Sequence, residues 1–209
     1  ALKTSQTAGD NMAIGNFSLR DNTSGNNNTS IGLSAMKENT EGISNTVVGR
    51  SALCANTTAS NNTAVGRSAL AANTTADNNT AVGRSALGGN TTGTANAAVG
   101  CGALDANTTG SNHTAMGRNA LTSNTTSSSN SAFGGNSLNN NTTGSFNTAV
   151  GYDALLLNTT ANNNTAVGTD SLRANTTGTN NSAFGRFALT ANSTGSSNTA
   201  GGTDSFFFF

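Results

Sequence analysis

The chain repeats itself every 17 residues, and this period constrains the fold more than any other feature. One column of the repeat is mostly apolar and recurs without an insertion or deletion, and a Gly follows each of its members. Strict self-similarity at a fixed period is the signature of a solenoid or another repeat architecture. The repeats are anchored at Ile14, Ile31, Val48, Val65, Val82, Val99, Met116, Phe133, Val150, Val167, Phe184 and Gly201.

A second apolar column, mostly Leu, lies five residues after the first. Each repeat therefore offers two large apolar side chains, and we expect both columns to form the packed core of the fold. The predicted core positions are Val48, Leu53, Val65, Leu70, Val82, Leu87, Val99, Leu104, Val150, Leu155, Val167 and Leu172.

Two columns of Asn accompany the apolar columns. In stacked strands, identical Asn side chains in register form hydrogen-bonded ladders, which explains why Asn recurs at fixed positions. The first predicted ladder, three residues before the anchor, contains Asn45, Asn62, Asn79, Asn96, His113, Asn130, Asn147 and Asn164. The second, eight residues after the anchor, contains Asn56, Asn73, Asn90 and Asn107.

The composition of the repeat favours strands over helices. A period of 17 is too short for two-helix repeats, and Asn, Thr, Gly and Ser are poor helix formers. Residues 63–65 and 69–70 are short β-favouring pieces separated by turn residues, and the Gly column suits a corner that needs positive φ or close backbone approach. We therefore predict an all-β fold, a parallel β-solenoid with 17 residues per rung and about 12 rungs.

The whole chain reads as a single repeat array over residues 1–209, with a partial repeat at 1–10. Ala1 and Leu2 already occupy repeat columns, and Phe206 alone keeps the register within the terminal Phe tract. We therefore expect a segment of a longer shaft, or a unit that stacks end to end. Because two large apolar side chains per rung fill a thin solenoid poorly, an apolar column should also pack against neighbouring chains, and a closed homotrimer is predicted.

At these columns the chain resembles a known repeat class. Residues 62–70, Asn-Thr-Ala-Val-Gly-Arg-Ser-Ala-Leu, followed by Asn73-Thr74-Thr75, are similar to repeats of phage tail-fibre-like and bacterial surface fibre proteins. The chain is more distantly similar to the head repeats of trimeric autotransporter adhesins, although its period is longer. The resemblance implies trimeric β-solenoid fibres, extracellular on virions or cell surfaces, that serve attachment or spacing.

Charge and motifs narrow the choice of function. Nine basic and nine acidic residues give no net charge, so neither nucleic acid nor an anionic membrane is an expected partner. No apolar run approaches the ~20 residues of a membrane span. The acids are scattered over several columns and no metal-binding or phosphate-binding motif is present, so we predict no catalytic site, no metal, no cofactor and no enzyme activity. The predicted partners are copies of the chain itself, with a cell-surface glycan as an alternative.

Three smaller features have a simple interpretation. His113, the single His, occupies an Asn position and is interpreted as a ladder substitute. Cys54 and Cys101 lie three rungs apart, or ~14 Å along the axis, which is too far for a disulfide within the chain. Five Arg residues share one column, for which a solvated face or an interchain contact is favoured over a stripe for acidic glycans; they are Arg50, Arg67, Arg84, Arg118 and Arg186.

Two alternative functions remain open from the sequence. The Asn-Thr-Thr triplets match the N-glycosylation acceptor pattern, although a ladder and a glycan cannot use the same Asn, so a glycosylated filament subunit is one alternative. The candidate acceptors are Asn56, Asn73, Asn90, Asn107, Asn124, Asn141, Asn158 and Asn175. The other alternative is an ice-binding solenoid, because the Thr column of Thr46, Thr63 and Thr80 gives one regular rank.

Overall fold

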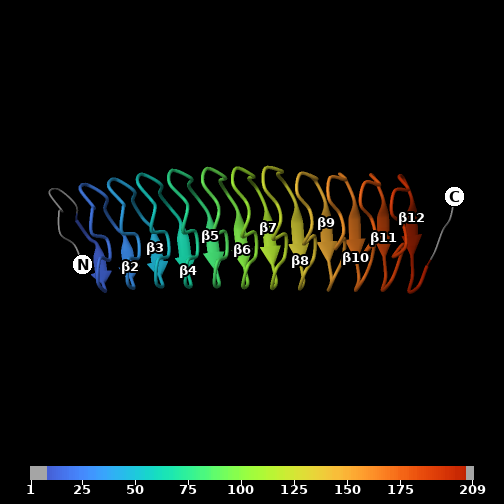
Figure 1. Cartoon of the computed structure of the whole chain (residues 1–209), viewed down its shortest axis with the longest axis horizontal. Helices are drawn as coiled ribbons and strands as arrows, with labels where there is room; N and C mark the ends of the chain where they lie inside the picture. Colours follow the sequence, from blue (N-terminus) through green and yellow to red (C-terminus); the bar gives the residue numbers. More distant parts are fainter. Residues whose placement is uncertain (1–8, 206–209) are drawn as a thin grey trace.

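The computed structural model describes residues 9–205, which form a parallel β-solenoid with one short strand in each rung (Figure 1). The strands form one twelve-stranded parallel sheet in chain order. They are β1 (Met12–Ile14), β2 (Thr29–Ile31), β3 (Thr46–Val48), β4 (Thr63–Val65), β5 (Thr80–Val82), β6 (Ala97–Val99), β7 (Thr114–Met116), β8 (Ser131–Phe133), β9 (Thr148–Val150), β10 (Thr165–Val167), β11 (Ser182–Phe184) and β12 (Thr199–Gly201).

Each strand pairs with its neighbours in a register of 17 residues. Val65 is opposite Val48 on one side and Val82 on the other, and the same offset holds from β1 to β12. The columns of the sequence are therefore straight ranks along the solenoid, as the period predicts. Most of the partial repeat at 1–10 and the Phe tract at 206–209 lie outside the described residues.

Backbone hydrogen bonds join the rungs outside the strands as well. The Ser68 amide donates to the Arg50 carbonyl of the preceding rung at 3.0 Å, and the Leu70 amide donates to the Ala86 carbonyl of the next at 3.0 Å. The 69–70 segment is hydrogen-bonded in this way but forms no strand. The prediction of a second β piece there is wrong, because the chain turns at Ser68 and Leu70, which have φ of 58° and 51°.

Positive φ recurs in whole columns rather than at single residues. The column of Leu70 has φ between 47° and 55°, and the columns of Ser68 and Asn61 behave similarly. The left-handed region costs an L-residue roughly 1–2 kcal/mol, which is uncommon for Leu. Here the Leu amide reaches the next rung and the side chain is fully buried, and both gains offset the strain.

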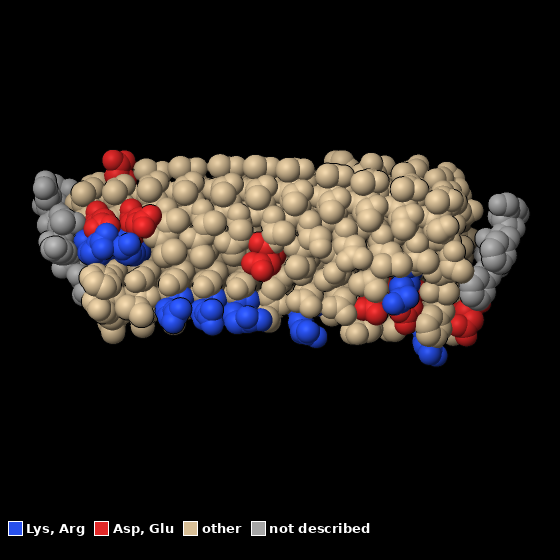
Figure 2. Space-filling model, in the orientation of Figure 1, with Lys and Arg blue, Asp and Glu red and all other residues tan. Residues whose placement is uncertain are grey.

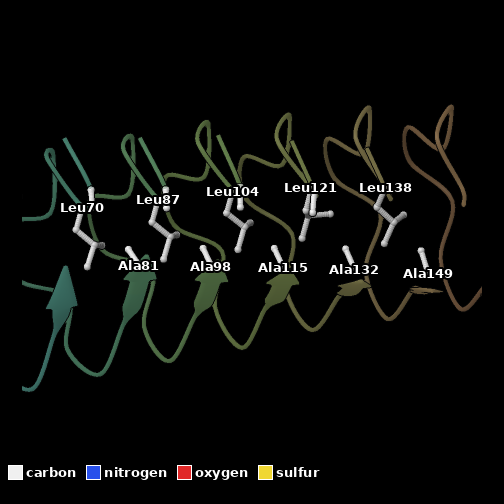
Figure 3. Close-up of a cluster of buried hydrophobic side chains, with 14 of the residues drawn as sticks. Leu70, Ala81, Leu87, Ala98, Leu104, Ala115, Leu121, Ala132, Leu138 and Ala149 are labelled. Carbon is white, nitrogen blue, oxygen red and sulfur yellow. The ribbon is translucent and has the colours of Figure 1, made fainter. Parts of the chain in front are cut away.

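The core consists of Leu and Ala ranks (Figure 3). Leu87, Leu104 and their equivalents are fully buried, and their side chains point toward the Ala side chains of the strands, such as Ala98 and Ala115. Side chains alternate along a strand, so in each Thr-Ala-Val strand the central Ala faces inward while Thr and Val face outward. Within one chain the narrow interior thus holds a small strand residue and a Leu from the opposite wall.

The apolar anchor column does not belong to this core. Val48 and Val150 keep 37% and 38% of their surface exposed, and Val65, Val82, Val99 and Val167 are half-buried. The prediction of these six Val residues as core positions is corrected by strand alternation, whereas the predicted Leu positions are buried: Leu53, Leu70, Leu87, Leu104, Leu155 and Leu172.

The Gly column forms the corner that follows each strand. Gly66 has φ of 134°, a region that side chains avoid, and a Cβ at this position would stand 2.5 Å from the carbonyl oxygen of Gly83 in the next rung. Backbone meets backbone at this corner, so no side-chain movement makes room.

We expect Gly66→Ala to lower the free energy of unfolding by at least about 2 kcal/mol, because strain and overlap add. Gly135→Ala is the matched control, since that Gly follows the corner Gly and its added Cβ meets only the movable ring of Tyr152, at 3.2 Å. Denaturant titration followed by circular dichroism measures both variants. Equal midpoints for the two would contradict the role assigned to the corner.

Candidate functional surface: ladders inside, an apolar rank outside

The second Asn column forms a continuous side-chain ladder. The Nδ2 of Asn90 donates to Oδ1 of Asn73 at 3.0 Å and to the Gly93 carbonyl of its own rung at 2.9 Å. The Nδ2 of Asn107 donates in turn to Oδ1 of Asn90 at 2.8 Å. Each buried amide therefore connects two rungs and closes a turn in its own rung. Asn56 takes the same place further down the ladder.

The first Asn column connects rungs by a different pattern. The Oδ1 of Asn79 accepts the backbone amide of Asn96 at 3.0 Å, and the Nδ2 of Asn79 donates to the Gly93 carbonyl at 2.9 Å. Side chain and backbone thus alternate along this rank. The described members of both columns are buried along most of the solenoid, including Asn45, Asn62, Asn79, Asn96, His113, Asn130, Asn147, Asn164, Asn56, Asn73, Asn90 and Asn107.

Complete pairing makes these polar columns compatible with a core position. Within residues 9–205, no buried side-chain nitrogen or oxygen lacks a hydrogen-bond partner. A buried amide that lost its partners would cost about 1–3 kcal/mol.

The same burial removes the candidate glycan acceptors. A glycan is attached to the amide nitrogen, and here that nitrogen is enclosed and donates to two oxygens, as in Asn158 at 2.8 and 3.1 Å. The folded chain therefore offers none of the eight as acceptors, namely Asn56, Asn73, Asn90, Asn107, Asn124, Asn141, Asn158 and Asn175.

His113 reproduces the bonds of the Asn that it replaces. Its Nδ1 accepts the amide of Asn130 at 3.2 Å, as Asn Oδ1 does elsewhere, and its Nε2 lies 2.7 Å from the Ser127 carbonyl, where Asn Nδ2 would donate. These contacts require the neutral ring with the proton on Nε2. Burial lowers the pKa of His113 from its ordinary value of 6.5, and the two backbone hydrogen bonds only partly oppose this. The interpretation of His113 as a ladder substitute is confirmed.

The outer face of the sheet is an uncharged strip of two ranks. Thr and Val side chains alternate with the buried Ala, so the Thr63 rank and the Val65 rank share this face. Six members of the Val rank have exposed fractions between 37% and 55%: Ile14, Val48, Met116, Phe133, Val150 and Phe184. The anchor column is therefore an apolar surface of the single chain, and not a part of its interior.

In two strands a bulky residue on this face is accompanied by a small one. Phe replaces Val in β8 and β11, and in both strands Ser replaces Thr, giving Ser131-Ala132-Phe133 and Ser182-Ala183-Phe184. Ser occurs at no other position of the Thr column among the twelve strands. Residues i and i+2 are neighbours on one face of a strand, so the smaller Ser gives part of the room that the larger Phe takes.

This geometry is a poor ice-binding face. Each strand presents one Thr beside one Val, and Phe133, Phe184 and Met116 are much larger than the Val residues beside them. The two other repeated Thr ranks, those of Thr74 and Thr75, lie outside the sheet on a bend. A flat array with two Thr per strand is therefore not formed.

The remaining candidate residues do not gather into a chemical centre. Cys54 and Cys101 are free thiols and half-buried. Burial is the main cause that raises the pKa of the Cys54 thiol. Among the residues that the structure describes, no three His, Cys, Asp or Glu side chains stand close enough together to hold a metal ion. The Arg column lies on the surface beyond the carboxyl ends of the strands (Figure 2).

Comparison of the chain with protein-family models, with curated proteins and with solved structures finds no match. The described rungs contain no helix that is long and apolar enough to cross a membrane.

Asn90→Ala tests the ladder. The change removes three side-chain hydrogen bonds, leaves the Oδ1 of Asn73 without a donor and takes one of the two acceptors from the Nδ2 of Asn107, so we expect a loss of about 3 kcal/mol in unfolding free energy. Thr92→Ala, an exposed position in the same rung, is the control and should be near neutral. Denaturant titration measures the unfolding free energy of both variants. A loss below about 1 kcal/mol in unfolding free energy for Asn90→Ala would argue against the ladder.

His113 predicts acid sensitivity with a defined sign. Because its pKa is lower in the folded than in the unfolded chain, the unfolded chain binds more protons, and stability falls as pH decreases below about 6.5. His113→Asn restores the repeat residue and should flatten this part of the profile, which thermal unfolding between about pH 7.5 and 5 measures. An unchanged slope in the variant would assign the effect to other groups, since His113 is the single His of the chain.

Proposed function

We propose that this chain is a structural segment of an extracellular fibre, a stiff shaft that spaces or presents an attachment structure on a virion or cell surface. The observation that carries the proposal is the uncharged apolar rank along the outer face of the whole sheet. A monomer gains nothing from such a continuous strip, whereas a fibre uses it to join chains side by side.

The partner in this proposal is another copy of the chain. The rank has the same period as the solenoid, so a second solenoid with parallel axis meets it rung for rung. Three chains around one axis would bring three such faces into a closed central seam, which is the arrangement we favour.

The Leu rank has a different part in this proposal. It is already enclosed within the single chain, so it stabilises each solenoid but offers no surface to a neighbour. The seam is accordingly assigned to the anchor column, and lateral assembly is expected to depend on Val, Met and Phe at this face rather than on Leu.

Stiffness follows from the hydrogen bonding. Each rung is joined to the next through the strand, the turns and two Asn ranks, so bending the shaft would stretch several bonds at once. Such a shaft has few exposed unpaired backbone groups along its length, which disfavours local opening and proteolysis.

Light scattering coupled to size exclusion tests the assembly. We expect a mass of about 62 kDa, three times 20.7 kDa, for the chain. The triple variant Val48→Lys, Val82→Lys and Val150→Lys should fall to the single-chain mass with an unchanged circular dichroism spectrum, because Lys charges repel across the seam.

The control for this experiment carries the same charges elsewhere. Thr75→Lys, Thr92→Lys and Thr109→Lys change an exposed column outside the sheet and should leave the mass unchanged. A wild-type chain that stays at the single-chain mass at high concentration would contradict the proposal. Large particles of variable length would favour an end-to-end filament.

A further inference from the structure

A stripe of unpaired Arg side chains lies next to the apolar face. Arg50, Arg67 and Arg84 occupy the same position on three successive rungs, and Arg118 follows two rungs later. Figure 2 shows blue Lys and Arg side chains along the lower edge of the molecule, the edge where the strands of Figure 1 end. The four span ~19 Å along the solenoid axis.

Within the described part of the chain, residues 9–205, these cations have no acidic ion-pair partner. All four are exposed, and none forms an ion pair with another residue within 9–205, whereas Arg20, Lys37 and Arg173 do. The Nη2 of Arg84 contacts the Cys101 sulfur at 3.2 Å, in the gap before Arg118. Like charges in register on successive rungs repel one another, and no ion pair within residues 9–205 offsets this repulsion.

Asp105 is an acidic side chain that interacts electrostatically with this column. Arg84 acts to lower the pKa of Asp105, but burial has the larger effect and raises it. Asp105 is thus a half-buried group rather than a neutralising partner, and the stripe keeps a local positive charge on a chain whose net charge is zero.

We propose that the stripe of Arg50, Arg67, Arg84 and Arg118 binds a linear sulfated polysaccharide laid along the solenoid axis. A guanidinium group donates two parallel hydrogen bonds to the oxygens of a sulfate, and a single file of Arg suits a single chain of anionic groups. The stripe is one residue wide and the sequence from 50 to 118 contains no Phe, Tyr or Trp, whereas single-stranded nucleic acids are bound on aromatic stacking platforms.

This site is separate from the seam proposed above. The Gly corner stands between the Val rank and the Arg rank, so association through the sheet would leave the stripe at the margin of the assembly. Copies of the chain would then present several parallel stripes, and binding would gain from multivalency. Polysaccharide binding and assembly can therefore fail independently.

Titration calorimetry with a heparin octasaccharide tests the stripe. We expect binding at about 50 mM salt that weakens steeply toward about 150 mM, as counterion release requires. The triple variant Arg50→Gln, Arg67→Gln and Arg84→Gln should bind at least about tenfold more weakly, with a shallower salt dependence. The corresponding triple Lys variant should retain part of the affinity, because it keeps the charge and loses the two-pronged contact.

Arg186→Gln is the matched control. It lies in the same column but has no Arg on the adjacent rungs, and its guanidinium stacks on Phe187 at 4.2 Å, so its loss should change affinity less than about twofold.

Equal binding by wild type and the triple Gln variant, or no binding at low salt, would overturn the proposal. Tighter binding of a single-stranded oligonucleotide of equal charge would overturn the ligand class, and a changed mass of the Gln variant would make the stripe an interchain contact.

Discussion

The hydrogen bonds between one rung and the next, all in the same 17-residue register, are the constraint on which the rest of this structure depends. Strand amides, turn amides and two ranks of Asn side chains all join neighbouring rungs, in a pattern that repeats every 17 residues. Because all of these bonds need neighbouring rungs of equal length, an insertion in one rung would displace them together, which explains a period kept without interruption. The register also permits strain: Leu70 and its equivalents remain in the left-handed region because each is bonded to the next rung and buried.

That register gives the surface its character. A residue that recurs in the sequence forms a straight rank on the solenoid. The two outward-facing residues of each strand therefore form a strip of Thr and Val along the sheet. The Arg that follows the Gly corner forms a charged line beside this strip. The first strip suits contact with a copy of the chain, since both have the same repeat. The second suits a polymer with regularly spaced anions. The fibre role that we propose would use both surfaces, one to hold chains together and one to bind a partner.

The sequence was sufficient to predict the architecture, but not to predict which apolar residues face the interior and which face outward. The period predicted the parallel solenoid, the rung count, both ladders and the substitution by His113, because each depends only on which residues fall in register. The Val rank was assigned to the core from hydrophobicity alone, although in a three-residue strand the inward position belongs to the central Ala. Strand alternation was the available signal. Nothing in the sequence indicated positive φ at Leu70, since a Leu rarely adopts it and the compensating bond comes from another rung. Whether an Arg forms an ion pair likewise depends on how the rung folds and cannot be predicted from the repeat column.

The most direct test of the register is a set of distances between spin labels placed on one exposed column. Cys introduced at Thr58 and, in separate variants, at Thr143, Thr160 or Thr177 would be labelled after Cys54 and Cys101 are replaced by Ser, and diluted with unlabelled chain. These pairs are five, six and seven rungs apart in the sequence. The account predicts narrow distributions near ~24, ~29 and ~34 Å, increasing by one rung spacing for each repeat. Broad distributions, or distances that do not increase in equal steps, would contradict a solenoid in constant register.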